Sequence, residues 1–156
     1  MDRPLFVYGT LRDPELLAAV LGRRVDPRAV AAAEAPGFRT VHYPGRTYPA
    51  LIRSAGEAAQ GQILLGLSRL ERRVLDAYEG EEYRRGLIPV LVEQEMHEAE
   101  TYLPTLVIAP TAEAWTLENW QKIHKSTVLA SEGRLAARLR AEIAAGPPPL
   151  PGRSGA

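Results

Sequence analysis

The stretch Phe6-Val7-Tyr8-Gly9-Thr10-Leu11-Arg12 places a glycine where a hydrophobic strand should end. Residues 4–8 are typical of a short buried strand, and Asp13-Pro14-Glu15 predicts a helix start with Asp13 as the N-cap. A turn between a strand and a helix N-terminus carries unpaired N–H groups beside the positive end of a helix dipole, and both favour a carboxylate or a phosphate. An ordinary strand-to-helix turn has the same pattern, so both interpretations remain open at this point.

Composition limits the classes of protein. The chain has 156 residues, which suits one domain over residues 1–146, followed by a flexible Pro/Gly-rich tail over residues 147–156. Nineteen basic and 19 acidic residues give zero formal net charge, so we expect neither a nucleic acid nor a membrane partner. The absence of cysteine excludes disulfides, thiolate nucleophiles and cysteine zinc sites. With no leader and no apolar run of about 20 residues, we expect a soluble, cytoplasmic protein.

Apolar runs and alternating patterns predict about six strands. They cover residues 4–8, 38–43, 47–52, 62–67, 86–95 and 100–109. Pro44-Gly45 marks a hairpin turn between the second and third strands, and His97-Glu98 is placed in the loop between the last two. About six strands interrupted by one helix suit a mixed or closed sheet better than a regular βαβ array.

Helical periodicity predicts four helices. They cover residues 15–21, 69–79, 115–125 and 131–145. Gly22 closes the first helix, and Ser68 with Glu71 has the spacing of a capping box that opens the second, which Gly80 ends. We expect the last two helices to cover the sheet.

Four carboxylates, Asp76, Glu79, Glu81 and Glu82, lie within seven residues at the end of the second helix. Glu79 follows Leu75 by four residues, so it leans toward the buried face in the last helical turn. Partial burial and the negative end of the helix dipole both disfavour the ionised carboxylate, which would raise its pKa toward the range useful for proton transfer. The other three are expected to face solvent or pair with neighbouring arginines. Glu79 is therefore the candidate acid/base, with a surface position as the alternative.

Two segments resemble the signatures of the gamma-glutamylcyclotransferase-like family. Tyr8-Gly9-Thr10-Leu11-Arg12 resembles the first signature, and Leu75-Asp76-Ala77-Tyr78-Glu79-Gly80, followed by Tyr83 and Arg84, resembles the second. Tyr48-Pro49-Ala50-Leu51 is similar to a further family segment, and residues 115–120 are similar to one in the plant avirulence-induced branch. The order and separation of the segments agree, so the resemblance covers most of residues 4–126.

The resemblance implies an α+β fold, a small mixed β-barrel of about six strands, closed or nearly closed, with flanking helices. It implies that Glu79 is the proton carrier and that the turn holds the substrate carboxylate. The substrate-binding residues it implies are Tyr8, Gly9, Thr10, Leu11 and Tyr83. The Tyr83 hydroxyl would orient the substrate or Glu79, although Tyr83 as a plain aromatic strand residue is the alternative.

The implied reaction is an intramolecular cyclisation. The α-amine of a γ-glutamyl amine or peptide attacks its own γ-carbonyl, which closes 5-oxoproline and expels the amine. Because this needs only an anchor for the carboxylate and one group that carries a proton, no enzyme nucleophile, metal or cofactor is expected. The expected partner is a small γ-glutamyl substrate, and the expected state is a monomer or homodimer.

Two other functions remain open from the sequence. The same pocket would serve a protein that binds or senses a small carboxylate without chemistry, and the proline-rich tail over residues 147–156 would serve an interaction protein. A metal site at His97-Glu98 is rejected because no second histidine follows at helical spacing. Trp115 and Trp120 are interpreted as anchors that pack the C-terminal segment onto the sheet.

Overall fold

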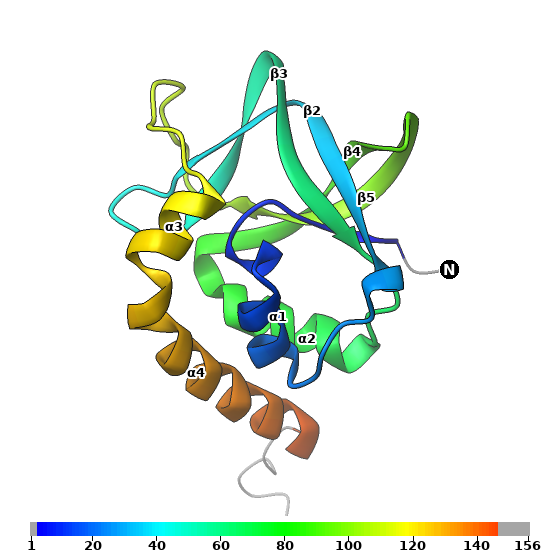
Figure 1. Cartoon of the computed structure of the whole chain (residues 1–156), viewed down its shortest axis with the longest axis vertical. Coiled ribbons are helices and arrows are strands. Elements are labelled where there is room, and N and C mark those ends of the chain that lie inside the picture. Colours follow the sequence, from blue (N-terminus) through cyan, green and yellow to red (C-terminus); the bar gives the residue numbers. More distant parts are fainter. Residues whose placement is uncertain (1–2, 147–156) are drawn as a thin grey trace, which may run out of the picture.

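Five strands close into a barrel in the computed structural model, which describes residues 3–146 (Figure 1). The strands are β1 (Leu5–Val7), β2 (Val30–His42), β3 (Pro49–Leu64), β4 (Tyr83–Val92) and β5 (Glu95–Pro104). Their order is β1-β3-β2-β4-β5, and a parallel bridge between Leu5 and Glu100 closes the barrel. The expected α+β barrel is confirmed, with five strands in place of about six. The predicted tail, residues 147–156, lies outside the described residues.

The strand count differs because β3 is one long strand. It contains residues 49–52 of the first predicted strand, residues 62–64 of the next, and all the residues between them. β3 pairs with β2 from Leu64 to Ala58 and again from Arg53 to Pro49, and the register shifts between the two segments beside Gly37. The intervening stretch is polar and rich in alanine and glycine, so it lacks an apolar alternation, and only its pairing with β2 makes it a strand.

The hairpin turn between β4 and β5 is also placed differently. Glu93 and Gln94 form it, with φ angles of +47° and +68°, while His97 and Glu98 lie within β5. The predicted strand over residues 100–109 ends at Pro104. A two-residue turn with both φ angles positive normally contains asparagine or glycine, so Glu-Gln gives no turn signal in the sequence.

Gln94→Gly is expected to stabilise the protein by about 0.5 kcal/mol. A side chain in the left-handed region is strained, and glycine relieves that strain at a small loss of entropy on folding. Thermal or urea unfolding measures the change. A destabilised Gln94→Gly variant would contradict the left-handed assignment.

The helices lie at one end of the barrel and along one side (Figure 1). They are α1 (Pro14–Leu21), α2 (Arg69–Glu79), α3 (Leu117–Ile123) and α4 (Lys125–Ala145). The caps are those predicted: Asp13 accepts from the Leu16 amide at 3.0 Å, and Gly22 ends α1 with a φ of +76°. Ser68 and Glu71 form both hydrogen bonds of the capping box.

α4 begins at Lys125, six residues before the predicted start, and lies mainly against α1 and α2. The expectation that it covers the sheet is therefore wrong. The Nζ atom of Lys125 lies 2.8 Å from an oxygen of Asp13, the N-cap of α1. The Arg140 guanidinium donates to the carbonyls of Ala19 and Val20, at 2.7 and 2.8 Å, near the other end of α1. α4 thus holds α1 at both ends.

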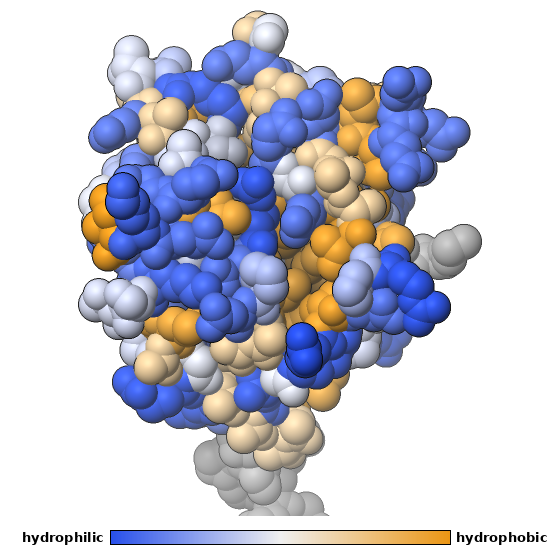
Figure 2. Space-filling model, viewed as in Figure 1, coloured by the Kyte–Doolittle hydropathy of each residue, from blue (hydrophilic) through white to orange (hydrophobic). Residues whose placement is uncertain are grey.

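Two clusters of buried side chains form most of the core. One fills the barrel and includes Phe6, Phe38, Leu51, Ile88 and Val90. The other joins the barrel to the helices and includes Leu5, Leu16, Val20, Leu64, Leu75, Trp115 and Trp120. Both tryptophans are buried, as expected of packing anchors. On the face shown in Figure 2 the surface is mostly hydrophilic, and apolar residues reach it in limited patches. Within residues 3–146, no helix is long and apolar enough to span a membrane.

Candidate active site

A cavity of about 300 Å³ lies where the barrel meets the helices. All six residues predicted from the sequence line it: Tyr8, Gly9, Thr10, Leu11, Glu79 and Tyr83. Further lining residues come from segments far apart in the chain: Phe6, Val7, Leu16, Thr47, Tyr48, Pro49, Tyr78, Glu82, Tyr102, Trp120, Val128, Glu132 and Leu135. The structure therefore brings the two signature segments to one cavity.

The first signature forms a tight turn directly after β1. Gly9 precedes a single 3₁₀ turn, η1 (Thr10–Arg12). Within residues 3–146, the amides of Gly9, Thr10 and Leu11 donate to no other protein group. The first turn of α1 is capped by the Asp13 side chain, so the free donors come from the 3₁₀ turn and not from the start of α1. Such a group of unpaired amides suits an anion.

Gly9 is required because the turn leaves no room for a side chain at this position. A Cβ atom at this position would lie 2.6 Å from Cγ of the Pro49 ring. The φ angle of Gly9 is −122°, which other residues also adopt. The close approach of Pro49, which lies in the family-like segment Tyr48-Pro49-Ala50-Leu51, therefore explains the glycine of the first signature.

Gly9→Ala is expected to destabilise the protein by about 1–3 kcal/mol, because the Pro49 ring cannot move aside without shifting the turn. Gly133→Ala is the matched control: a Cβ there would lie 3.6 Å from the Cβ of Ala19, an ordinary contact in a helix, so this variant should gain about 0.5–1 kcal/mol. Urea unfolding measures both. Equal stability of the two variants would contradict this role of Pro49.

Glu79 is the last residue of α2, and its side chain is partly buried, as the sequence indicated. Burial, and then the nearby carboxylate of Glu132 on α4, raise the pKa of Glu79 to about 8. The sequence also predicted a raised pKa for Glu79, with the helix dipole as the second cause beside burial. In the structure, the second cause is the like charge of Glu132 on another helix. A carboxyl that titrates near neutral pH suits proton transfer.

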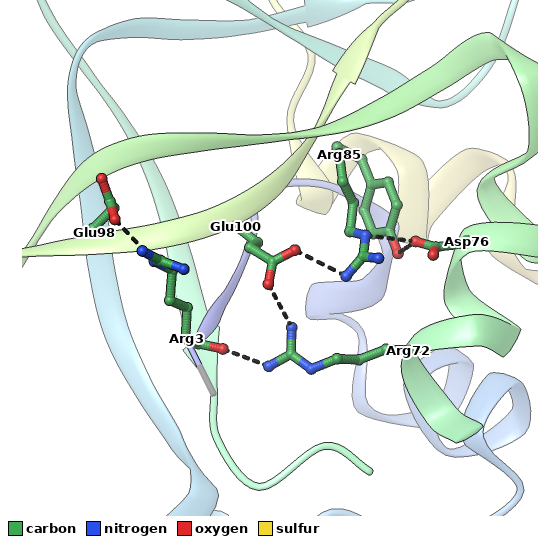
Figure 3. Close-up of polar contacts among 7 residues, drawn as sticks. Arg3, Arg72, Asp76, Arg85, Glu98 and Glu100 are labelled. Carbon is green, nitrogen blue, oxygen red and sulfur yellow. Dashed lines mark hydrogen bonds and ion pairs between the residues drawn. The ribbon is translucent and has the colours of Figure 1, made fainter. Parts of the chain in front are cut away.

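Ion pairs fix α2 against the barrel. Figure 3 shows the guanidinium groups of Arg72 and Arg85 both directed at Glu100 on β5, at 3.2 and 2.8 Å. Arg85 also lies 3.0 Å from Asp76, which accepts a 2.7 Å hydrogen bond from the Tyr102 hydroxyl. Asp76 is one turn before Glu79, so these contacts hold the end of α2 in place. The expectation that Asp76 pairs with a neighbouring arginine is confirmed.

The site tyrosines bond to backbone carbonyls. Tyr8 donates to the Tyr102 carbonyl at 2.5 Å, and Tyr83 donates to the Pro49 carbonyl. Burial is the main cause that raises the pKa of both phenols, and Glu79 adds to it. Both hydroxyls are therefore neutral at neutral pH. The Tyr83 ring lines the cavity, but its hydroxyl proton is donated to the Pro49 carbonyl and does not point to a substrate.

Glu82 lines the cavity from the next turn, but it is paired. The Tyr48 hydroxyl donates to one of its oxygens, and Nε of Arg46 lies 3.2 Å from the other. Burial, followed by the Glu82 hydrogen bond, raises the pKa of Tyr48 to about 12. The rings of Tyr48 and Tyr83 are 6.2 Å apart, which completes an aromatic wall.

Glu132 is a further cavity residue that was not predicted from the sequence. Val128, Glu132 and Leu135 line the cavity at i, i+4 and i+7 spacing on α4. A single glutamate within an apolar stripe of a helix was the available signal. Among residues 3–146, no group of three or more His, Cys, Asp and Glu side chains could hold a metal ion.

Comparison with known proteins agrees with this arrangement. The family model of the AIG2-like gamma-glutamyl cyclotransferases matches residues 5–122. AIG2-like protein A of Arabidopsis thaliana is 32% identical over 124 residues, which are 78% of this chain and 73% of that protein.

Solved structures share the fold. A solution structure of another Arabidopsis thaliana protein has a TM-score of 0.62 and 28% identity, over 87% of this chain and 91% of that chain. A gamma-glutamyl cyclotransferase structure has a TM-score of 0.55 and 18% identity, over 97% and 92% of the two chains. With both signatures at one cavity, a matching family model and these relatives, the chain belongs to the AIG2-like gamma-glutamyl cyclotransferase family.

Proposed function

We propose that this protein cyclises a γ-glutamyl amine or peptide to 5-oxoproline and releases the amine. The observation that carries the proposal is that Glu79, a carboxyl with a pKa of about 8, shares one cavity with the unpaired amides of Gly9, Thr10 and Leu11. The amides would hold the substrate α-carboxylate, and Glu79 would carry protons next to it. Family membership supports a gamma-glutamylcyclotransferase-type activity.

The reaction balances with one proton carrier. Glu79 takes a proton from the α-ammonium, and the free amine attacks the γ-carbonyl carbon. A C–N bond forms to close the ring, and the bond from that carbon to the leaving nitrogen breaks. The attacking nitrogen loses two protons in all, and the leaving nitrogen gains two. Glu79 passes the first to the leaving nitrogen, is then free to accept the second, and passes that one to the departing amine, which leaves as an ammonium ion.

A substrate panel tests the proposal. The panel contains L-γ-glutamyl conjugates of a neutral amine, a diamine and an amino acid, with the α-glutamyl isomer of each as the matched control. We expect 5-oxoproline, measured by mass spectrometry, from at least one γ-glutamyl conjugate and from no α-glutamyl isomer. Folded protein that forms no 5-oxoproline from any conjugate between pH 6 and 9 would overturn the proposal. Thermal stabilisation by the conjugates without product would favour a carboxylate-binding protein instead.

The value of kcat/KM is expected to rise with pH up to about 8. Only ionised Glu79 accepts a proton, and its pKa is raised to about 8, so the active fraction grows about tenfold per pH unit below that value. A pH–rate profile at substrate concentrations below KM measures this. A profile that is flat between pH 6 and 8 would contradict Glu79 as the base.

A further inference from the structure

Glu132 is a carboxylate on an otherwise apolar part of α4. Val128 and Leu135 lie beside it on the stripe that lines the cavity, and its side chain is partly buried. No Lys, Arg or His of the described residues forms an ion pair with it. A partly buried carboxylate without a cation is unfavourable in the free protein, so its position suggests a cationic ligand.

Glu79 is also a partly buried carboxyl group without a cation beside it in the described part of the chain. It makes no ion pair within residues 3–146, and no Lys, Arg or His belongs to the lining of the cavity. Burial and the Glu132 carboxylate raise the pKa of Glu79. Four phenols surround it, Tyr8, Tyr78, Tyr83 and Tyr102, and burial raises their pKa values, with Glu79 adding to the effect. The cavity therefore contains two carboxylates that no protein cation neutralises.

Other carboxylates near the site are neutralised. Glu82 is held by Arg46 and Tyr48, and Asp76 is held by Arg85 and Tyr102. Arginine is thus available around the cavity but does not reach Glu79 or Glu132. Tyr78 hydrogen-bonds to Glu132, so what distinguishes Glu79 and Glu132 from Glu82 and Asp76 is the lack of a cation among the described residues.

We infer that Glu132 is a second substrate-binding carboxylate, which together with Glu79 holds the α-ammonium group of the γ-glutamyl substrate. The inference rests on the proposed function. The substrate ammonium supplies the positive charge that the cavity lining lacks. In the substrate, the carbon that bears the ammonium also bears the α-carboxylate that the turn would hold. When Glu79 takes a proton, the neighbouring Glu132 side chain stabilises the positive charge that develops on the attacking nitrogen as the C–N bond forms.

Two unreactive ligands test this role. L-norleucine and hexanoate both carry a carboxylate on the same carbon chain, and only norleucine has an α-ammonium group. Calorimetry would compare their Kd values for the wild type, for Glu132→Gln and for Glu142→Gln, a matched change at an exposed position of the same helix. We expect the wild type to bind norleucine about tenfold more tightly than hexanoate. Glu132→Gln should lose most of that preference while keeping its affinity for hexanoate, and Glu142→Gln should behave as the wild type.

Three results would overturn the inference. In the first, Glu132→Gln retains the preference for norleucine. In the second, Glu132→Gln weakens the binding of both ligands equally, as a packing role predicts. In the third, the wild type shows no preference. An effect of Glu132→Gln on the preference, combined with no 5-oxoproline from the substrate panel, would contradict the proposed function and leave the ammonium site standing. A wild type that binds neither ligand shows no preference and so overturns the inference, and 5-oxoproline from the substrate panel would then still support the proposed function.

Discussion

Glu79→Gln is expected to lower the rate of 5-oxoproline formation by about 10³-fold or more while the fold stays intact. Glutamine has nearly the same shape, but it cannot accept a proton from the substrate ammonium, and general acid–base groups of this kind contribute about 10²–10⁴-fold. Single-turnover assays with a conjugate that the wild type accepts would measure the loss. Undiminished turnover in Glu79→Gln would contradict the mechanism.

Glu81→Gln is the matched control, because Glu81 is two residues further along and exposed. It should keep its activity. Stability supplies a second comparison: the pKa of Glu79 is raised in the folded state, so the wild type loses stability as pH rises from about 4.5 to 8, and Glu79→Gln does not. The melting temperature of Glu79→Gln should therefore exceed that of the wild type above pH 8.

Asp13→Ala is expected to destabilise the protein by about 3 kcal/mol. Asp13 is fully buried, and its carboxylate accepts hydrogen bonds from the Leu16 amide, from Gln121 at 2.9 Å and from Lys125 at 2.8 Å. Removal of this side chain takes away a helix cap and leaves Lys125 without its buried partner. Urea unfolding at pH 7 measures the loss.

Asp26→Ala is the control, because Asp26 also caps a helical turn before a proline, in η2 (Pro27–Ala29), but is exposed. It should lose about 1 kcal/mol or less. Burial alone would raise the pKa of Asp13, but the hydrogen bonds from Lys125, Leu16 and Gln121 outweigh burial and lower it. The stability that Asp13 contributes is therefore present above pH 4 and falls below it, so Asp13→Ala and the wild type should converge in acid. Equal losses in the two alanine variants at pH 7 would contradict the role of the buried network.

The parts of the fold that could be predicted from the sequence are those set by local chemistry. The Asp13 cap, the Gly22 end and the Ser68 capping box each depend on residues within one helical turn, and the structure contains all three. The long β3 strand and the Glu93-Gln94 turn depend on pairing with distant segments. Their own residues carry weak or opposing local signals, so the sequence alone did not place them.

The candidate site shows the same division. Its two signature segments were recognisable, and the spacing after Leu75 was enough to predict the partial burial of Glu79. Glu132 was not predictable as a site residue because it lies 53 positions after Glu79, and only the packing of α4 against α2 brings it to the cavity. The roles of the six predicted site residues stay predictions until the variants are assayed.

The attachment of α4 to both ends of α1 bears on where this protein can be shortened. The family model ends at residue 122, just before Lys125, Glu132 and Arg140. A fragment cut at that limit would lose the cation that neutralises Asp13, the donor to the last carbonyls of α1 and one wall of the cavity. Because α1 follows directly after the turn at Gly9, such a fragment would also loosen the amides of that turn. The part of the chain that holds the cavity together is therefore longer than the segment by which the family is recognised.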